Sequence, residues 1–482
     1  MTGAPTAPSG TSSATPATAP AVDPAGAPLL SRSTAPGPPA APVRILHVGV
    51  GNFFRAHQAW YTDQAADAAH WGIAAFTGRS PGAAQTLRRQ DGLYTLITRT
   101  ADGDRFHVVR SLSAVHPVDE HDAWLDYWCR REVVLVTLTV TEAGYLNRPD
   151  GGLDTSRADV RADTAALRAD RRSPVRTTPG RLVAGLLARR DAGAGGIALV
   201  PCDNLPDNGT VLSALVTEFA AAVDPSLVGW LEQNVTVATT MVDRITPATS
   251  GEHRALVLAG TGHLDAAPVA TEAFSEWVVQ GDFPHGRPSW ETAGARFVQD
   301  VAPFEQRKLR LLNGAHSLLA YAGSAIGHET VADAIADPRC RAWVEQWWQE
   351  ASADLPLPVE ELVAYRRALL DRFGNPSIRH SLAQIAVNGS QKIPARVLPT
   401  LRAARAAGSV PAGAARILAA WVGHLRGNGA PIDDVRAAEL RSLTSGSVAD
   451  SVERVVAFVA PDLAGDEQLI AAVLERVQDL SR

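Results

Sequence analysis

The sequence predicts an α/β protein with an N-terminal dinucleotide-binding domain of the Rossmann type and a mainly α-helical C-terminal domain. Three observations support this fold class. Short apolar runs alternate with helical stretches from residue 43 to about residue 285, which is typical of a parallel sheet with helical crossovers. The first run leads into a turn with two glycines. From about Arg296 onward, apolar residues recur at helical spacing.

The composition excludes several classes of protein. The chain has 482 residues, with 45 Lys plus Arg against 51 Asp plus Glu, so no strongly basic face for nucleic acid is expected. No apolar run approaches the ~18 to 20 residues that a membrane helix needs, so no membrane partner is expected. Cys129, Cys202 and Cys340 are widely separated and predict neither disulfides nor a metal site, which favours a cytoplasmic protein.

Residues 1–42 predict a disordered tail. They are nearly all Ala, Pro, Thr, Ser and Gly, with Asp23 and Arg32 as the only charged residues. Such a segment has too little apolar surface to offset the entropy lost on ordering. No basic start followed by an apolar stretch is present, so we do not interpret the segment as a targeting peptide.

The nucleotide-binding domain is expected to span residues 43–285, and the helical domain residues 286–482. The Gly- and Pro-containing segment 281–287 is the predicted bridge. The predicted strands are 44–50, 73–77, 93–98, 133–140, 196–201 and 235–240. The helices predicted between them begin near Ala56 or cover 81–89, 181–190 and 211–222. In the C-terminal domain the predicted helices are 308–322, 329–336, 341–351, 359–373 and 412–425.

The turn after the first strand is a candidate cofactor site. Gly49 and Gly51 would let the backbone turn tightly and approach a pyrophosphate. The third position of the dinucleotide fingerprint, usually Gly or Ala, is Phe54. After the second strand, no acid for the ribose is evident, and Arg79 stands beside Ser80 instead. Arg79 would contact the 2'-phosphate of NADP or be a solvated turn residue, so NAD is the expected cofactor and NADP the alternative.

Polar residues directly follow the strand at 196–201. The carboxyl end of a parallel strand is where ligands of open α/β sheets bind, and Asn204 is the functional candidate there. Asp207 and Asn208 are interpreted as helix-capping residues ahead of the helix at 211–222. Glu142 and Asp243 each end another strand, where they would line the site or act as turn or ion-pair residues.

The helix that starts at Lys308 carries the strongest catalytic candidates. At 100° per residue, Lys308, Asn313 and His316 fall on one arc, together with Leu309 and Leu312. An inward lysine with a lowered pKa would serve as a general base, the amides would stabilise an alkoxide and His316 would hold a substrate hydroxyl.

The alternative for the same helix is an ion pair between Glu305 and Lys308 on a half-exposed face. The thirteen histidines show no zinc-ligand spacing, so no metal is expected.

Taken together, these motifs resemble the mannitol dehydrogenase family of polyol-specific long-chain dehydrogenases. The resemblance runs in order from about residue 44 to at least residue 397. The residues that carry it are 49–58, 90–95, 138–145, 202–204, 240–247, 308–316 and 372–394.

The resemblance implies a zinc-independent oxidoreductase with its site between the two domains. Lys308 would be the general acid/base, Asn204 and Asn313 would polarise the reacting oxygen and His316 would position the substrate. The implied cofactor-binding residues are Gly49, Gly51, Asn52, Phe53, Arg79, Glu142 and Asp243. The implied substrate-binding residues are Arg55, Asn204, His316 and Lys392.

The substrate within the family stays open at the level of sequence. The run 202–209 resembles mannitol 2-dehydrogenases, which interconvert mannitol and fructose, and this is the first expectation. The run Gly389 to Pro394 resembles fructuronate reductases, and there Lys392 would meet a substrate carboxylate, the cofactor or an ion-pair partner. The expected partner is a small sugar alcohol, ketose or uronate, and the protein would be a monomer or small homo-oligomer. A ligand-binding protein without catalysis is the alternative of another class.

Overall fold

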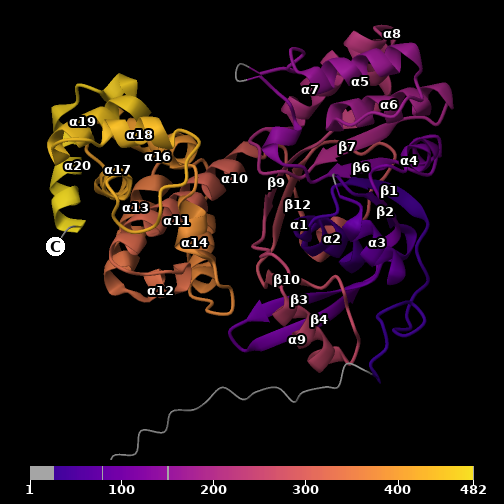
Figure 1. The fold of residues 1–482 in the computed structure, drawn as a ribbon, viewed down its shortest axis with the longest axis horizontal. Helices are drawn as coiled ribbons and strands as arrows, with labels where there is room; N and C mark the ends of the chain where they lie inside the picture. Colours follow the sequence, from indigo (N-terminus) through magenta and orange to yellow (C-terminus); the bar gives the residue numbers. More distant parts are fainter. Residues whose placement is uncertain (1–25, 79, 149–150, 481–482) are drawn as a thin grey trace, which may run out of the picture.

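The computed structural model describes residues 26–78, 80–148 and 151–480 of the chain. They form two lobes, an α/β domain and a helical domain, which meet near helix α10 (Ala302–Arg307) (Figure 1). Over the described residues, no helix is both long and apolar enough to cross a membrane. The three cysteines are free.

A six-stranded parallel sheet forms the centre of the N-terminal domain. Its order is β5-β2-β1-β6-β7-β8, which is the order typical of dinucleotide-binding domains, with a switch point between β1 and β6. The predicted Rossmann-type fold is therefore confirmed. The strands are β1 (Val43–Val48), β2 (Gly72–Phe76), β5 (Leu112–His116), β6 (Leu135–Leu138), β7 (Ile197–Pro201) and β8 (Val235–Val237).

Two of the predicted strands do not lie wholly in the six-stranded parallel sheet. The run at 93–98 forms β3, which turns back at once into antiparallel β4 and joins a separate sheet. The run at 235–240 divides at Ala238 into β8 and β9, and β9 leaves the main sheet to pair with β11. The strands of the two small sheets are β10 (Val269–Glu272), β3 (Tyr94–Thr100) and β4 (Gly103–Val109), and β12 (Arg296–Phe297), β11 (Glu276–Gln280) and β9 (Thr239–Asp243).

Helices cover both faces of the main sheet because its strands bury side chains on both sides. Along β1, Leu46 and Val48 pack in the core with Trp124 and Trp128 of α4, whereas Ile45 packs in the opposite core with Phe54 of α1. The helices of this domain are α1 (Asn52–Ala56), α2 (Gln58–Gln64), α3 (Gly82–Arg89), α4 (His121–Trp128), α5 (Ala158–Ala169), α6 (Thr178–Asp191), α7 (Asn208–Val223), α8 (Ser226–Asn234) and α9 (Gly251–Thr261).

The C-terminal domain is built around helix α17, which is buried over nearly its whole length and packs against α13, α16 and α20. The buried side chains of this domain's core include Trp347, Trp348 and Trp421. After α10 come two π-helical segments, Lys308–Asn313 and Leu319–Gly323, on either side of α11 (Gly314–Leu318). The other helices are α12 (Val331–Ala336), α13 (Pro338–Ser352), α14 (Val359–Phe373), α15 (Leu382–Ala386), α16 (Gly389–Ala406), α17 (Ala412–Leu425), α18 (Ala437–Leu443), α19 (Val448–Val459) and α20 (Glu467–Leu480).

Residues 26–42 correct the expectation of a disordered tail, and residues 1–25 lie outside the described part of the chain. Leu30 is buried, and its backbone N–H donates to Leu264 O at 2.9 Å. The Arg32 guanidinium donates to the carbonyls of Arg110 and Leu112, each at 3.1 Å. The composition of the whole segment did not reveal these contacts, because many of the segment's contacts join its backbone carbonyls to distant residues such as Arg110 and Ser113.

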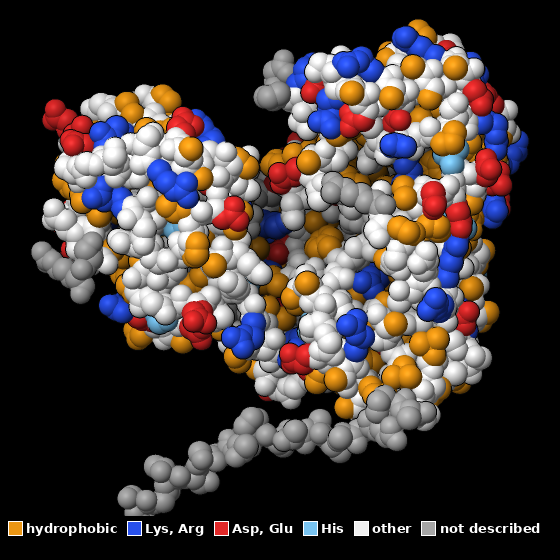
Figure 2. Space-filling model, viewed as in Figure 1, with side chains coloured by type: hydrophobic (Ala, Val, Ile, Leu, Met, Phe, Trp, Pro, Cys, Tyr) orange, Lys and Arg blue, Asp and Glu red, His pale blue; other side chains and the backbone are white. Residues whose placement is uncertain are grey.

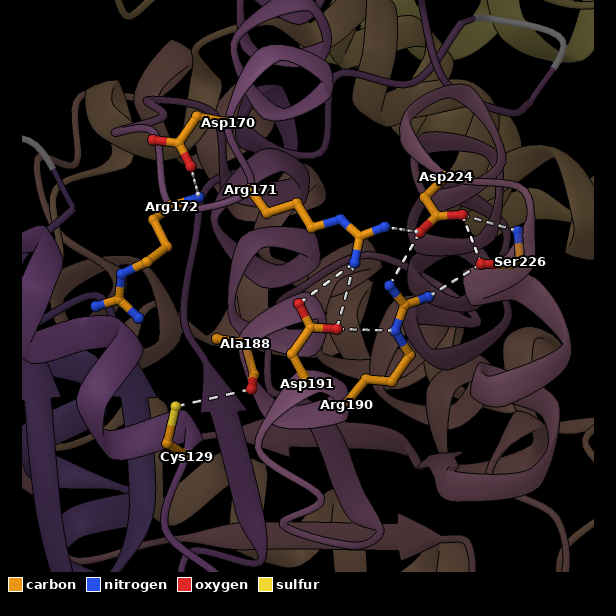
Figure 3. A network of polar contacts seen from close by, with 9 residues as sticks. All are labelled: Cys129, Asp170, Arg171, Arg172, Ala188, Arg190, Asp191, Asp224 and Ser226. Carbon is orange, nitrogen blue, oxygen red and sulfur yellow. Dashed lines mark hydrogen bonds and ion pairs between the residues drawn. The ribbon is translucent and has the colours of Figure 1, made fainter.

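An ion-pair network joins the loops at the outer end of this domain (Figure 3). Arg171 and Arg190 donate to the same oxygen of Asp224, at 2.8 and 2.9 Å. The other Asp224 oxygen accepts from the Ser226 hydroxyl at 2.6 Å. The Ser226 hydrogen bond and the Arg190 guanidinium lower the pKa of Asp224 to about 2.

We expect Asp224→Ala to destabilise the protein by about 1 kcal/mol at pH 7, because Arg171 is half exposed and water screens the pair. Because the folded-state pKa is depressed, this stabilisation is present above the ordinary aspartate range and is lost as pH falls toward 2. Urea unfolding of wild type and variant at pH 7 and pH 3 measures it. A difference that is as large at pH 3 as at pH 7 would contradict the assignment.

Candidate active site

A cleft of about 1020 Å³ is lined by side chains of both domains. Figure 2 shows the hollow between the two lobes. The N-terminal domain contributes the ends of β7 and β9, which agrees with ligand binding at the carboxyl ends of strands. The polar lining residues include Glu142, Asn204, Asp243, Lys308, Asn313, His316, Arg379, His380, Lys392 and Arg396.

Lys308 stands at the junction of the two domains. Its ammonium donates to the side-chain oxygen of Asn204 at 2.6 Å and to the carbonyl of Val242 at 2.6 Å. Burial lowers the pKa of Lys308, and the Asp243 carboxylate opposes that shift. These two contacts replace the ion pair with Glu305 that was the predicted alternative. The Glu305 carboxylate instead accepts the backbone N–H of Asp207 at 3.1 Å.

The helix that carries Lys308 is wider than the sequence predicted. The 100° spacing assumed an α-helix, whereas Lys308–Asn313 is π-helical. The indoles of Trp347 and Trp348 donate to the carbonyls of Arg310 and Leu311, each at 2.9 Å, and so compete with the regular helical ladder. Lys308, Asn313 and His316 nevertheless line the same cleft, as the arc predicted.

Two histidines meet at the wall of the cleft. The rings of His316 and His380 lie 4.9 Å apart and nearly perpendicular. Burial, and next the neighbouring His380, lowers the pKa of His316 well below its usual range, so the ring is neutral. Among the described residues, His316 Nε2 and His380 Nδ1 are buried and have no hydrogen-bond partner. Buried polar atoms need partners, so these two nitrogens are suited to substrate hydroxyls.

One end of the cleft is basic. Lys392 of α16 donates to Ile385 O at 3.1 Å, and burial lowers its pKa to about 8. Arg396 donates to the carbonyl of Asn313 at 3.2 Å, and burial lowers its pKa to about 10. Arg379 also lines the cleft. Sequence reasoning missed Arg396, although it follows Lys392 by one helical turn and could have been found from that spacing.

Asp243 is tied to the helical domain. Its carboxylate accepts from Arg372 of α14 at 2.7 and 2.8 Å and from the Tyr365 hydroxyl at 3.1 Å. Arg372 also donates to Glu272 at 2.8 and 2.9 Å. This placement favours the ion-pair role that the sequence left open for Asp243. Glu142 lies exposed on the cleft wall.

The glycine turn borders a second hollow of about 300 Å³, at the ends of β1, β2 and β6. Gly49 has φ of 105°, and a Cβ there would lie 2.2 Å from the Thr139 carbonyl oxygen, so the turn requires glycine. A Cβ on Gly51 would meet no atom within 4 Å, which leaves room above the turn. This space and the exposed backbone fit the pyrophosphate of a dinucleotide.

Of the predicted site residues next to the turn, one lines the main cleft and two form hydrogen bonds to other parts of the protein. Phe53 lines the main cleft. Asn52 binds the Pro247 carbonyl at 3.0 Å, and Arg55 is buried with hydrogen bonds to Asn52 and Ala267, each at 2.6 Å. Among the described residues Arg55 lines a smaller hollow and not the main cleft, so its expected contact with the substrate stays a prediction. Arg79 lies outside the described residues.

Two family models match the chain. The model of the mannitol dehydrogenase Rossmann domain covers residues 43–292, and that of the mannitol dehydrogenase C-terminal domain covers residues 300–481. The chain belongs to the mannitol dehydrogenase family. The predicted family and the predicted class, an oxidoreductase of polyols or sugar acids, are thereby confirmed.

Several members of the mannitol dehydrogenase family are similar over nearly their whole length. The chain is 35% identical to D-mannonate oxidoreductase of Escherichia coli K12, over 91% of this chain and 93% of the relative. It is 35% identical to D-arabinitol 4-dehydrogenase of Ralstonia nicotianae, over 90% and 95%. The structure of Pseudomonas fluorescens mannitol 2-dehydrogenase, a ternary complex with NAD and D-mannitol, matches with a TM-score of 0.77 and 32% identity, over 95% of each chain.

The capping roles predicted for Asp207 and Asn208 are wrong. Asp207 has φ of 49° and makes no side-chain cap, and α7 begins at Asn208 itself. The Asn208 amide instead bridges strand ends, donating to the carbonyls of Asp203 and Thr240 and accepting the Thr240 N–H at 3.0 Å. Asn208 therefore fixes the loop that presents Asn204 to Lys308.

One group of side chains in the described part of the chain has the spacing of metal ligands: His328, Asp337 and Cys340. The Asp337 carboxylate already accepts from Arg339 and from His328, the latter at 3.1 Å. Asp337 also caps α13. We therefore describe the group as a hydrogen-bonded cluster at the start of that helix, apart from the cleft.

Gly51→Ala is expected to weaken cofactor binding at least tenfold without destabilising the fold. The added methyl group enters the open space over the turn and displaces a bound pyrophosphate, but it contacts no protein atom. Titration with NADH, followed by nucleotide fluorescence, and a thermal melt measure the two effects. If the Gly51→Ala variant bound NADH as tightly as wild type, the placement of the cofactor at this turn would be contradicted.

Proposed function

We propose that the protein transfers a hydride between NAD and a secondary alcohol of an open-chain sugar acid or polyol, with Lys308 as the general base. The observation that carries this proposal is the position of the Lys308 ammonium, held by Asn204 and Val242 in the interdomain cleft. The complex of the Pseudomonas fluorescens relative with NAD supports the choice of cofactor. When bound, the nicotinamide accepts or returns the hydride.

The two acceptors around Lys308 direct its lone pair. Neutral lysine has two N–H bonds, and these satisfy the Asn204 oxygen and the Val242 carbonyl. The lone pair then faces the cleft, where it takes the proton as the substrate O–H bond breaks. The carbinol carbon loses its hydride at the same time and becomes a carbonyl carbon. The Asn204 and Asn313 amide N–H groups stabilise the charge that develops on oxygen.

The basic end of the cleft favours a substrate with a carboxylate. Lys392, Arg396 and Arg379 line the cleft, where Glu142 is the acid that acts on both Lys392 and Arg396. A carboxylate at that end would gain charge-assisted hydrogen bonds, and His316 and His380 would hold the intervening hydroxyls. The similarity to D-mannonate oxidoreductase supports this class. The second candidate, a neutral polyol such as mannitol, is favoured by the ternary complex of the relative.

Oxidation of NADH with D-fructuronate and with D-fructose tests the substrate class. We expect kcat/KM to be more than tenfold higher for fructuronate. Lys392→Met should lower kcat/KM for fructuronate about 10- to 100-fold, because a hydrogen bond to a charged group contributes about 1.5–3 kcal/mol. The same variant should change the value for fructose much less, which serves as the internal control. Equal use of both ketoses, with no effect of Lys392→Met, would support the neutral polyol instead.

A further inference from the structure

His47 lies buried in β1, directly beneath the glycine turn. Its Nε2 is 2.7 Å from the Gly49 carbonyl oxygen and 3.0 Å from the Thr139 hydroxyl. Its Nδ1 is 2.7 Å from the Thr137 hydroxyl. The side chain does not line either hollow, so it touches neither substrate nor cofactor.

These partners fix the tautomer of His47. Burial lowers its pKa to about 3, so the ring is neutral and carries one N–H. The Gly49 carbonyl can only accept, so that hydrogen is on Nε2. Nδ1 is then an acceptor, and the Thr137 hydroxyl donates to it. The Gly49 carbonyl therefore fixes the tautomer, and Thr137 on β6 satisfies the remaining ring nitrogen in that tautomer.

Phe54 fixes the plane of the imidazole. The two rings stack at 3.4 Å between centroids and 7° between planes, and Phe54 is fully buried. Phe54 occupies the third position of the dinucleotide fingerprint, where glycine usually allows a helix to pack closely on the strand. Here α1 has only five residues and ends at Ala56, and the stacked pair of His47 and Phe54 lies between it and β1.

The hydrogen bond to the Gly49 carbonyl determines which backbone group of the turn is directed at a ligand. In a trans peptide the C=O and the following N–H point in opposite directions. With the Gly49 carbonyl directed inward at His47 and Thr139, the Val50 N–H is directed outward, and Val50 borders the hollow above the turn. That N–H is a donor suited to a pyrophosphate oxygen.

We propose that His47 is a positioning residue for the cofactor: through its Nε2–H it holds the Gly49 carbonyl inward, so that the turn presents its backbone N–H to the pyrophosphate. The proposal rests on the proposed function, because it requires a dinucleotide at this turn. The stacked Phe54 and the Thr137 hydroxyl at Nδ1 orient the same imidazole ring.

The test compares His47→Phe, His47→Gln and Thr137→Val with wild type. His47→Phe keeps an aromatic ring against Phe54 but removes the donor, and we expect the Kd for NADH to rise at least tenfold. Thr137→Val removes the hydrogen bond to Nδ1 that helps to orient the ring, and we expect a rise of about threefold or more. His47→Gln supplies an amide N–H and should recover part of the loss. The rise should appear in the Kd and KM for NADH, with a much smaller change in kcat at saturating cofactor.

A merely structural role would lower the melting temperature of all three variants and leave the Kd of the folded fraction unchanged. That result, or wild-type Kd values in both His47→Phe and Thr137→Val, would overturn the proposal while leaving the proposed function intact. Failure of the wild-type protein to bind NADH or NADPH would overturn both.

Discussion

Replacing Lys308 with Ala is expected to lower kcat by about 10²- to 10⁴-fold, which is the usual contribution of a general base. The Kd for NADH should stay near that of wild type, because Lys308 lies in the main cleft and not at the glycine turn. Stopped-flow and steady-state assays of NADH turnover, with a parallel fluorescence titration, measure both quantities.

Lys308→Arg is the matched control, because arginine keeps the positive charge but does not release its proton near neutral pH. It should be as inactive as the alanine variant. In wild type, polyol or aldonate oxidation should rise with pH through a pKa below the usual range for lysine, since the neutral amine is the active form. Asp243→Asn should shift that rise to lower pH, because the Asp243 charge raises the pKa of Lys308. A fully active Lys308→Ala would exclude the mechanism.

Arg372→Met is expected to lower the free energy of unfolding by about 3–5 kcal/mol, as the loss of one partner from a buried ion pair usually does. The Arg372, Asp243 and Glu272 side chains are each only 3–4% exposed, so the two carboxylates would be left unpaired in the interior. Urea unfolding followed by far-UV circular dichroism measures the loss.

The pH dependence of this loss has a definite sign. Burial opposes the ionisation of Asp243, but Arg372, together with Lys308 and Tyr365, holds the pKa of Asp243 below its usual range. Without Arg372 burial should raise that pKa above the unfolded-state value, so the variant is expected to be most destabilised at high pH and to recover as pH falls through the raised pKa. Arg402→Met, which removes an equally bidentate but exposed pair with Asp462, should change stability little. Equal stability of the two variants would contradict a central role for Arg372.

Local patterns predicted the parts of the site that depend on nearby residues. The apolar run of β1, the two glycines after it and the helical spacing of Lys308, Asn313 and His316 are all contained in short segments, and the structure brings each to a cleft or hollow. The alternation of strands and helices likewise predicted the parallel sheet, although not the order of its strands.

Contacts between distant segments could not be predicted in this way. The indoles that widen the Lys308 helix donate across 37 residues. The Arg372 pair with Asp243 spans 129 residues, so neither sequence neighbourhood reveals it. The departure of β9 from the main sheet depends on its antiparallel pairing with β11. The partners that turn a surface segment such as residues 26–42 into an ordered one are equally remote.

The two hydrogen bonds of Lys308 have a consequence for the order of events during folding. The glycine turn and its supports belong to the N-terminal domain, whereas Lys308 reaches Asn204 and Val242 from the other domain. The nucleotide hollow is complete as soon as the first domain has folded, but the base acquires its partners only when the domains dock. Domain docking is a separate and often slower step. We therefore expect a refolding chain to regain affinity for the dinucleotide before it regains turnover.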